Sequence, residues 1–242
     1  MCGRYTLKTD PKVLAMDFNV AAAAMNSETI GNLDLPIVPI TQMSGTALNP
    51  NFNVAPTHEV PAVCKRDGVN TLAVFSWGLV PHWAKDRAIG NRMINARVET
   101  VLEKPSFRTA VNKRRCIVPA DGWYEWQKTG TQKQPYFCSA ADESVLGFAG
   151  MYEHWSAPDG TSLWSLTIMT TQARAELAHI HDRMPVLVTP ELRNEWLSDG
   201  PAPIAAVLDA AHSTPWLQVW PVSSAVGNVR NNHEHLTDQI EV

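Results

Sequence analysis

The sequence lacks the features that identify several large classes of protein. No stretch approaches the run of about 20 apolar residues that a membrane-spanning helix needs. The N-terminus has no basic segment followed by an apolar run, so we expect no signal peptide. Internal repeats, low-complexity tracts and a phosphate-binding loop of the GxxxxGK kind are also missing. These absences argue against an integral membrane protein, a repeat protein and a P-loop nucleotide hydrolase.

Cysteine is scarce and widely spaced. There are four cysteines and no Cys-x-x-Cys pair, which argues against a zinc ribbon. Cysteines that are far apart in the sequence fit a reducing compartment. We therefore expect a cytoplasmic protein with no bound metal and no cofactor. The four residues are Cys2, Cys64, Cys116 and Cys138.

The composition is that of a soluble globular protein. Of 242 residues, 45% are hydrophobic and 18% are charged, which suits one large domain or two small ones. The net charge of −4 does not indicate a nucleic-acid-binding protein. Residues 97–115 differ, because six basic residues there stand against two acidic ones, a local balance of +4. A solvated helix face would show the same pattern.

The N-terminal segment carries the most reactive candidate, Cys2. Removal of the initiator methionine would leave Cys2 with an α-amine and a thiol on adjacent carbons. The amine has a reference pKa of about 7.7–8.0, and a cationic neighbour such as Arg4 would lower the pKa of the thiol. An aldehyde would form an imine with the amine, and the thiol would close a thiazolidine ring. The alternative is that Cys2 is a small buried residue, because free cysteines are often buried.

Periodicity and turn signals predict many short strands in hairpins, interrupted by few helices. Strands are expected at 60–64, 71–77, 94–99, 116–119, 123–127, 135–138, 145–152, 163–169 and 216–222. Helices are expected after Thr9 or Asp10, at 105–111, after Thr170 or Thr171 as far as Ile180, after Thr189, and at 204–211. Residues 20–50 have no sustained periodicity and predict a mobile loop, and 233–242 predict a polar tail.

Two stretches suit contact with an unpaired nucleotide. The loop at 77–83 contains Trp77 and Trp83, and tryptophan is usually a core residue but also a good stacking platform for a base. The alternation at 94–99 places Asn95 and Arg97 on one face of a strand. That pair is suited to hold a phosphate or sugar oxygen. An ordinary solvent-facing strand would alternate in the same way.

Two further residues are candidates for acid–base chemistry. Glu125 stands among aromatic residues in 121–126, and partial desolvation would raise its pKa. An exposed glutamate on an edge strand is the competing interpretation. His181, with Asp182 and Arg183 beside it, fits proton transfer near neutral pH. His179 and His181 could instead be part of a metal site, but no third ligand is near in sequence.

Seven motifs in the same order resemble those of the SOS response-associated peptidase family, whose bacterial and animal members shield abasic sites in single-stranded DNA. The resemblance runs from residue 2 to about residue 232. The motifs are Met-Cys-Gly-Arg-Tyr at the start, Phe-Asn-Val-Ala-Pro at 52–56, Trp-Gly-Leu-Val-Pro-x-Trp at 77–83, Asn-Ala-Arg-Val-Glu-Thr at 95–100, Asp-Gly-Trp-Tyr-Glu-Trp at 121–126, His-Asp-Arg-Met-Pro at 181–185 and Pro-Val-Ser-x-x-Val-Gly-Asn-Val at 221–229.

The resemblance implies a fold and a set of site residues. The fold is a single α+β domain over 1–242, with a strongly curved antiparallel sheet approaching a barrel and peripheral helices. The implied catalytic residues are Cys2, Asn95, Glu125 and His181. The implied DNA-binding residues are Arg4, Asn53, Pro56, Trp83, Arg97, Arg183 and either Thr170 or Thr171. Some members of the family have a second aromatic residue after the loop tryptophan, where this chain has Ala84.

The expected function is to sense and shield abasic sites in single-stranded DNA through a thiazolidine crosslink to Cys2. Glu125 would move protons during opening of the sugar ring, His181 would assist, and Asn95 would orient the reactants. The family also implies an abasic-site lyase and a peptidase that removes its own Met1, although ordinary aminopeptidase trimming would be sufficient for that removal. We expect a monomer that binds no membrane and lies at the nucleoid when bound to DNA.

Two other classes remain open. Class II glutamine amidotransferases also begin Met-Cys-Gly and use an N-terminal cysteine. Their domain usually contains an Asn-Gly-Glu-Ile-Tyr-Asn stretch, which this chain lacks. The second alternative is a protein that binds single-stranded or modified DNA reversibly, without forming an adduct.

Overall fold

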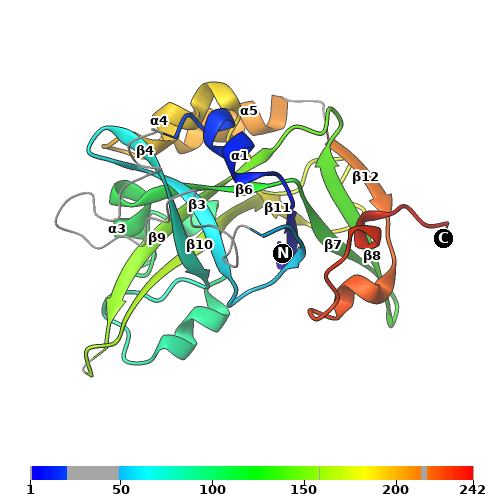
Figure 1. Ribbon diagram of the computed structural model, residues 1–242, viewed down its shortest axis with the longest axis horizontal. Coiled ribbons are helices and arrows are strands. Elements are labelled where there is room, and N and C mark those ends of the chain that lie inside the picture. Colours follow the sequence, from blue (N-terminus) through cyan, green and yellow to red (C-terminus); the bar gives the residue numbers. More distant parts are fainter. Residues whose placement is uncertain (1, 21–48, 158, 214–216, 242) are drawn as a thin grey trace.

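The structure, a computed structural model, describes residues 2–20, 49–157, 159–213 and 217–241 (Figure 1). The loop expected at 20–50 lies outside the described residues except at its two ends. The tail expected at 233–242 is described as far as residue 241 and contains a short 3₁₀ helix, η6 (Glu234–Thr237).

One group of strands forms a five-stranded antiparallel sheet. Its order is β12-β8-β7-β1-β2, and it lies on the right in Figure 1. The long hairpin of β7 and β8 is its centre, and the short strand β1 joins that hairpin to β2. The strands are β12 (Leu217–Pro221), β8 (Gln132–Ala140), β7 (Gly122–Thr129), β1 (Tyr5–Leu7) and β2 (Asn51–Val54).

A second sheet closes on itself. Its order is β11-β10-β4-β3-β6-β9, with β5 beside β10, and β9 pairs both with β6 and with β10. Only the pairings of β10 with β4 and β5 are parallel. The closed ring confirms the barrel-like α+β fold. The strands are β3 (Glu59–Arg66), β4 (Val69–Trp77), β5 (Asn95–Arg97), β6 (Arg115–Ala120), β9 (Leu146–Ser156), β10 (Ser162–Gln172) and β11 (Arg183–Pro185).

Local chemistry explains the β3–β4 hairpin. Asp67 and Gly68 both have positive φ, 47° and 82°, as the tight hairpin turn requires. Residues Val63 and Leu72 are opposite each other and buried, so the strand pair predicted from the sequence is confirmed.

Aromatic packing brings the N-terminal segment to the core between the sheets. Tyr5 of β1 is fully buried, and its ring lies 5.4 Å from that of Trp77 and 6.1 Å from that of Phe148. Trp123 of β7 also packs edge-on against Phe148, at 6.0 Å. Because Trp77 and Phe148 belong to the barrel, β1 is held where the two sheets meet. This packing determines the position of residue 2.

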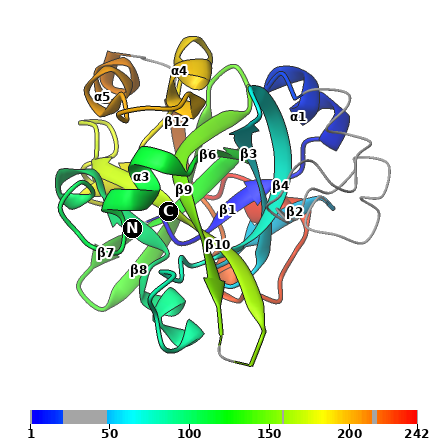
Figure 2. The same cartoon turned by 90° about the vertical axis from the view of Figure 1, so that its left-hand side faces the viewer.

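Helices cover one side of the sheets. In Figures 1 and 2, α1 (Pro11–Asp17), α4 (Arg193–Leu197) and α5 (Ile204–Ser213) lie along the same edge of the molecule. The side chain of Asp10 accepts from the Lys12 N–H at 2.8 Å, which confirms the predicted cap of α1. A fourth helix, α3 (Arg108–Lys113), packs near β9 and β6. In the described part of the chain, no helix has the length and apolar character that crossing a membrane requires.

Two predictions about secondary structure were wrong in part. No helix follows Thr170 or Thr171, because β10 continues to Gln172 and pairs with β11. Residues 175–180 instead form turns, and the Ala173 N–H donates to Asp182 O at 2.9 Å to close a hairpin. The strand expected at 94–99 stops at Arg97 and is followed by a 3₁₀ helix, η3 (Val98–Thr100).

Candidate functional site

Cys2 lies where the two sheets meet. Its side chain is fully buried, as the simpler interpretation of this residue predicted. Its surroundings are polar, however. The Asn95 Nδ2 donates to the Cys2 carbonyl oxygen at 2.8 Å. Burial, reinforced by the nearby carboxylate of Glu125, raises the pKa of the Cys2 thiol well above its usual range.

Glu125 is a desolvated carboxylic acid. It lies in β7, which has β8 on one side and β1 on the other, so it is not on an edge strand. Only 4% of the residue is exposed. Burial raises the pKa of Glu125 to about 7, because the ionised form loses its hydration. At neutral pH this group can therefore either donate or accept a proton.

A small pocket joins Glu125 to His181. The buried residues Trp123 and Cys138 also line this pocket, as does Arg183. Two apolar residues complete the lining, namely Leu177 and Ile180. No local pattern indicated Cys138, which lies at this pocket because β8 pairs it with Trp123.

His181 is oriented by its own turn. The Arg183 N–H donates to Nδ1 of His181 at 2.9 Å, and the Asp182 Oδ1 lies 3.0 Å from the same nitrogen. Burial lowers the pKa of His181, which favours the neutral ring. His179 is exposed and packs its ring against Tyr136, with 6.2 Å between ring centroids. The two histidines therefore face different surroundings, and the described residues include no cluster of three potential metal ligands.

Arg4 does not activate the Cys2 thiol, contrary to the expectation from their closeness in sequence. Its Nη1 donates to Asn53 Oδ1 and to the Val226 carbonyl, each at 2.7 Å. Asn53 in turn donates through Nδ2 to the carbonyl oxygens of Val226, Asn228 and Asn231 at 2.9–3.2 Å. Arg4 and Asn53 thus hold the C-terminal loop against β1 and β2, and the pKa of the thiol is raised rather than lowered.

Three of the predicted DNA-binding residues lie across adjacent strands. Thr170 in β10 is paired with Arg97 of β5 on one side, and β11 with Arg183 lies on the other. Arg97 is exposed, whereas Thr170 is buried. Arg183 binds both carboxylate oxygens of Glu99, at 2.6 and 3.0 Å, and the Thr170 carbonyl at 2.6 Å. Thr171 is buried as well.

The two tryptophans of the 77–83 loop have different environments. Trp77 is fully buried, and its indole N–H donates to Ile94 O at 2.9 Å. Trp83 is 50% exposed and is free to offer a flat surface. Pro56 is half-buried in the turn that follows β2. A larger cavity beneath residues 77–91 involves Trp77 and Arg87 but none of the catalytic candidates.

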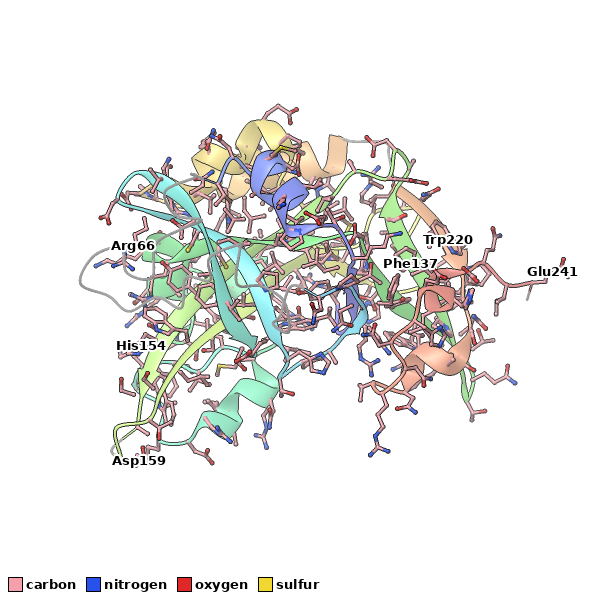
Figure 3. The ribbon with its side chains drawn as sticks, in the orientation of Figure 1. Arg66, Phe137, His154, Asp159, Trp220 and Glu241 are labelled. Atoms are coloured by element: carbon pink, nitrogen blue, oxygen red, sulfur yellow. The ribbon has the colours of Figure 1, made fainter. Side chains whose placement is uncertain are left out.

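Strand β9 holds the loop that carries Trp83, which the sequence did not reveal. The Trp155 indole N–H donates to the Ala84 carbonyl at 2.7 Å. The buried carboxylate of Glu153 lies 3.3 Å from Nδ1 of His82. In Figure 3, His154, which stands between these two β9 residues, lies on the opposite side of the molecule from Trp220 of β12. These contacts join residues about 70 positions apart, so no local pattern predicts them.

Comparison with known proteins adds three findings. The family model described as SOS response associated peptidase (SRAP) matches residues 1–229. Abasic site processing protein YoqW of Bacillus subtilis strain 168 is 35% identical over 242 residues, which cover 98% of this chain and 99% of that protein. Abasic site processing protein HMCES of Mus musculus is 33% identical over 222 residues, covering 76% of this chain and 63% of that protein.

A solved structure shares the fold. The crystal structure of a protein from Bacteroides thetaiotaomicron superimposes with a TM-score of 0.80 and covers 99% of this chain and 100% of its own. Its sequence is 24% identical, and the likeness is therefore one of fold alone.

Proposed function

Because this chain belongs to the SOS response-associated peptidase family, we propose that it captures abasic sites in single-stranded DNA as a thiazolidine at Cys2. One observation carries the proposal. Glu125 and His181 line one small pocket, the charge of Glu125 acts on the buried thiol of Cys2, and Asn95 donates to the Cys2 carbonyl, so four separate segments of the chain supply these groups. The relatives named as abasic site processing proteins support the choice of substrate.

The reaction requires removal of Met1. The nitrogen of Cys2 is an amide while residue 1 is attached, and an amide does not form an imine with an aldehyde. After removal, the α-amine attacks C1′ of the open sugar, and loss of water leaves the imine. The thiol then adds to the imine carbon, with its proton ending on nitrogen. The net change joins one aldehyde to one aminothiol and releases one water.

Glu125 is the proton carrier in this scheme. Its pKa of about 7 lets the protonated form donate to the ring oxygen as the sugar opens. The ionised form can then accept the thiol proton as the carbon–sulphur bond forms. That acceptor is needed because burial keeps the Cys2 thiol protonated at neutral pH. One carboxyl group therefore serves both the opening of the sugar and the later closure of the thiazolidine.

Asn95 and His181 have supporting roles. Asn95 holds the Cys2 carbonyl, and its Oδ1 is buried without a partner among the described residues. That oxygen is available to the new amine or to a sugar hydroxyl. His181, neutral and in the same pocket, moves protons on the imine. If the thiol failed to close the ring, the imine could undergo β-elimination, which would give the lyase activity.

The DNA strand is bound by stacking and by phosphate contacts. Exposed Trp83 is the stacking platform, and exposed Arg97 contacts a phosphate. Arg183 contacts the DNA strand through the N–H groups that do not bind Glu99 or Thr170. Pro56 lies beside the bound DNA strand. Arg4 and Asn53 shape the adjoining loop with their side-chain hydrogen bonds.

The proposal is tested by mixing purified protein with an abasic single-stranded oligonucleotide. Denaturing electrophoresis should show a crosslinked species. Its intact mass should equal the protein without methionine plus the DNA minus one water. Ammonia release from glutamine would favour an amidotransferase instead. Salt-sensitive binding without a crosslink would favour a reversible DNA-binding protein.

A further inference from the structure

One residue of the pocket that Glu125 and His181 line carries a buried hydrogen-bond donor with no acceptor among the described residues. The indole Nε1 of Trp123 is fully enclosed and has no partner among the described residues. Trp123 lines the same pocket as Glu125, His181 and Arg183. The great majority of buried polar groups in native proteins are hydrogen-bonded, and an unpaired one is costly. Such a donor at a reactive pocket points to a ligand atom that completes it.

Other tryptophans of this chain show what a structural indole does. Trp77 and Trp196 are equally buried, but each donates to a backbone carbonyl at 2.9 Å, of Ile94 and Cys116 respectively. Trp155 donates to Ala84 at 2.7 Å. Trp123, by contrast, has no acceptor among the residues that the structure describes, so its ring fills the core while its N–H makes no described hydrogen bond.

Arg183, another residue that lines this pocket, also has an unused donor. The Nε of Arg183 is buried and has no partner in the described part of the chain, although both terminal nitrogens of this side chain are bonded. No residue that the structure describes supplies the matching acceptor. Oxygen-rich sugar and phosphate groups are such acceptors, and a hydrocarbon is not.

We infer that the Trp123 indole N–H donates to an oxygen atom of the abasic deoxyribose and so places C1′ against the Cys2 amine. This assignment rests on the proposed function and adds a residue to it. Trp123 contacts substrate rather than acting through another residue. When the sugar ring opens, the former ring oxygen takes the proton supplied by Glu125, and a nearby N–H stabilises the charge that develops there.

The test compares two aldehydes. One is an abasic single-stranded oligonucleotide, and the other is propionaldehyde, which has no sugar oxygen to bind. Trp123→Phe should form the adduct with abasic DNA about tenfold more slowly, the effect of one good hydrogen bond. Its reaction with propionaldehyde, followed by intact mass, should keep the rate of the unaltered protein. A merely structural defect would slow both reactions alike.

A matched control is Trp77→Phe, which removes a buried indole whose N–H is already bonded. This variant should melt at a lower temperature than Trp123→Phe, because it removes a buried hydrogen bond and leaves the Ile94 carbonyl with the Ile168 N–H as its remaining described donor. It should not separate the two aldehydes. Replacing Trp123 with 3-benzothienylalanine, in which sulphur stands for the N–H, avoids the cavity and should reproduce the tenfold loss on DNA alone.

Three results would overturn the inference. They are an unchanged rate on abasic DNA, equal slowing with both aldehydes, and the same selective loss in Trp77→Phe. If the unaltered protein reacted with propionaldehyde but never with abasic DNA, the proposed function itself would fail, and this assignment would fall with it. The reaction of the unaltered protein with abasic DNA therefore distinguishes failure of the Trp123 assignment from failure of the proposed function.

Discussion

Asn53 and Asn95 are both strand asparagines near the N-terminal segment, yet their side chains are satisfied to different degrees. Asn53 uses both ends of its amide, accepting from Arg4 and donating to three carbonyl oxygens of the C-terminal loop. Asn95 makes one bond, to the Cys2 carbonyl, and its Oδ1 is buried without a described partner. Trp77 and Trp123 differ in the same way, because the indole N–H of Trp77 is hydrogen-bonded and that of Trp123 has no described partner.

The difference teaches how to separate structural from reactive polar groups in this protein. A completed hydrogen-bond network holds two chain segments together. Removing one member leaves its former partners buried without a hydrogen bond, which costs stability. An incomplete network can lose stability only through the bonds that it makes, and we propose that its unpaired groups bind the substrate. Changes at the first region should lower stability, and changes at the second should lower reactivity.

The largest effect is expected for Cys2→Ala. This variant keeps an α-amine but has no thiol, so the imine cannot close to a thiazolidine and no stable crosslink should remain. Denaturing electrophoresis with abasic single-stranded DNA measures it. Cys138→Ala removes a thiol from the same pocket but not from the N-terminus, and it should still give the crosslink. A crosslink that survives the change at Cys2 would defeat the proposed chemistry.

Glu125→Gln should slow crosslinking by about 100-fold, the lower end of what general acid–base catalysis supplies. The amide keeps the shape of the side chain but cannot exchange protons. The rate of the unaltered protein should change near pH 7, and this inflection should vanish in the variant. Initial rates of crosslinking, measured for both proteins across pH 5–9, test this prediction. An inflection that persists would assign the titration to another group.

The same substitution should alter the pH dependence of stability. The pKa of Glu125 is about 7 when folded, against about 4.3 in an unfolded chain. The folded state therefore holds the proton more tightly, and its added stability is present below about pH 4.3 and lost as pH rises towards 7. Between these values, Glu125→Gln should show a flatter melting temperature than the unaltered protein. Parallel curves would contradict the raised pKa.

The two asparagines give the direct test of the comparison. Asn53→Ala should lower the free energy of unfolding by about 2–3 kcal/mol, because it leaves Arg4 and several buried carbonyls incompletely paired. Asn95→Ala should cost about 1 kcal/mol, for one lost bond, while slowing crosslinking markedly. Urea unfolding of both variants measures the first quantity. Equal losses of stability would remove the distinction.

The smallest effect is expected for Trp155→Phe, which frees the Ala84 carbonyl and loosens the loop of Trp83. Affinity for undamaged single-stranded DNA should fall about threefold, as one neutral hydrogen bond allows. Trp164→Phe, on the paired strand β10, is the control and should leave affinity unchanged. In a Trp83→Ala background, Trp155→Phe should have no further effect. Additive losses would show that Trp155 does not act through Trp83.

Local sequence predicted the parts of the fold that neighbours along the chain decide. The Asp67-Gly68 turn, the cap of α1 by Asp10 and the face that Glu125 shares with Trp123 were all readable, because each depends on a few adjacent residues. The barrel came from the family resemblance rather than from periodicity. The helix after Thr170 was wrong because pairing with β11 outweighed local helix propensity.

The sequence by itself determined the hairpins, the alternation of buried and exposed faces, and the presence of an aminothiol once Met1 is removed. Tertiary structure alone decided that Arg4 turns to the C-terminal loop, that Cys138 and Trp123 join the pocket, and that Trp155 holds the Trp83 loop. The physical reason is distance along the chain. A side chain's exposure follows from strand period, but its hydrogen-bond partner depends on which remote strand closes beside it.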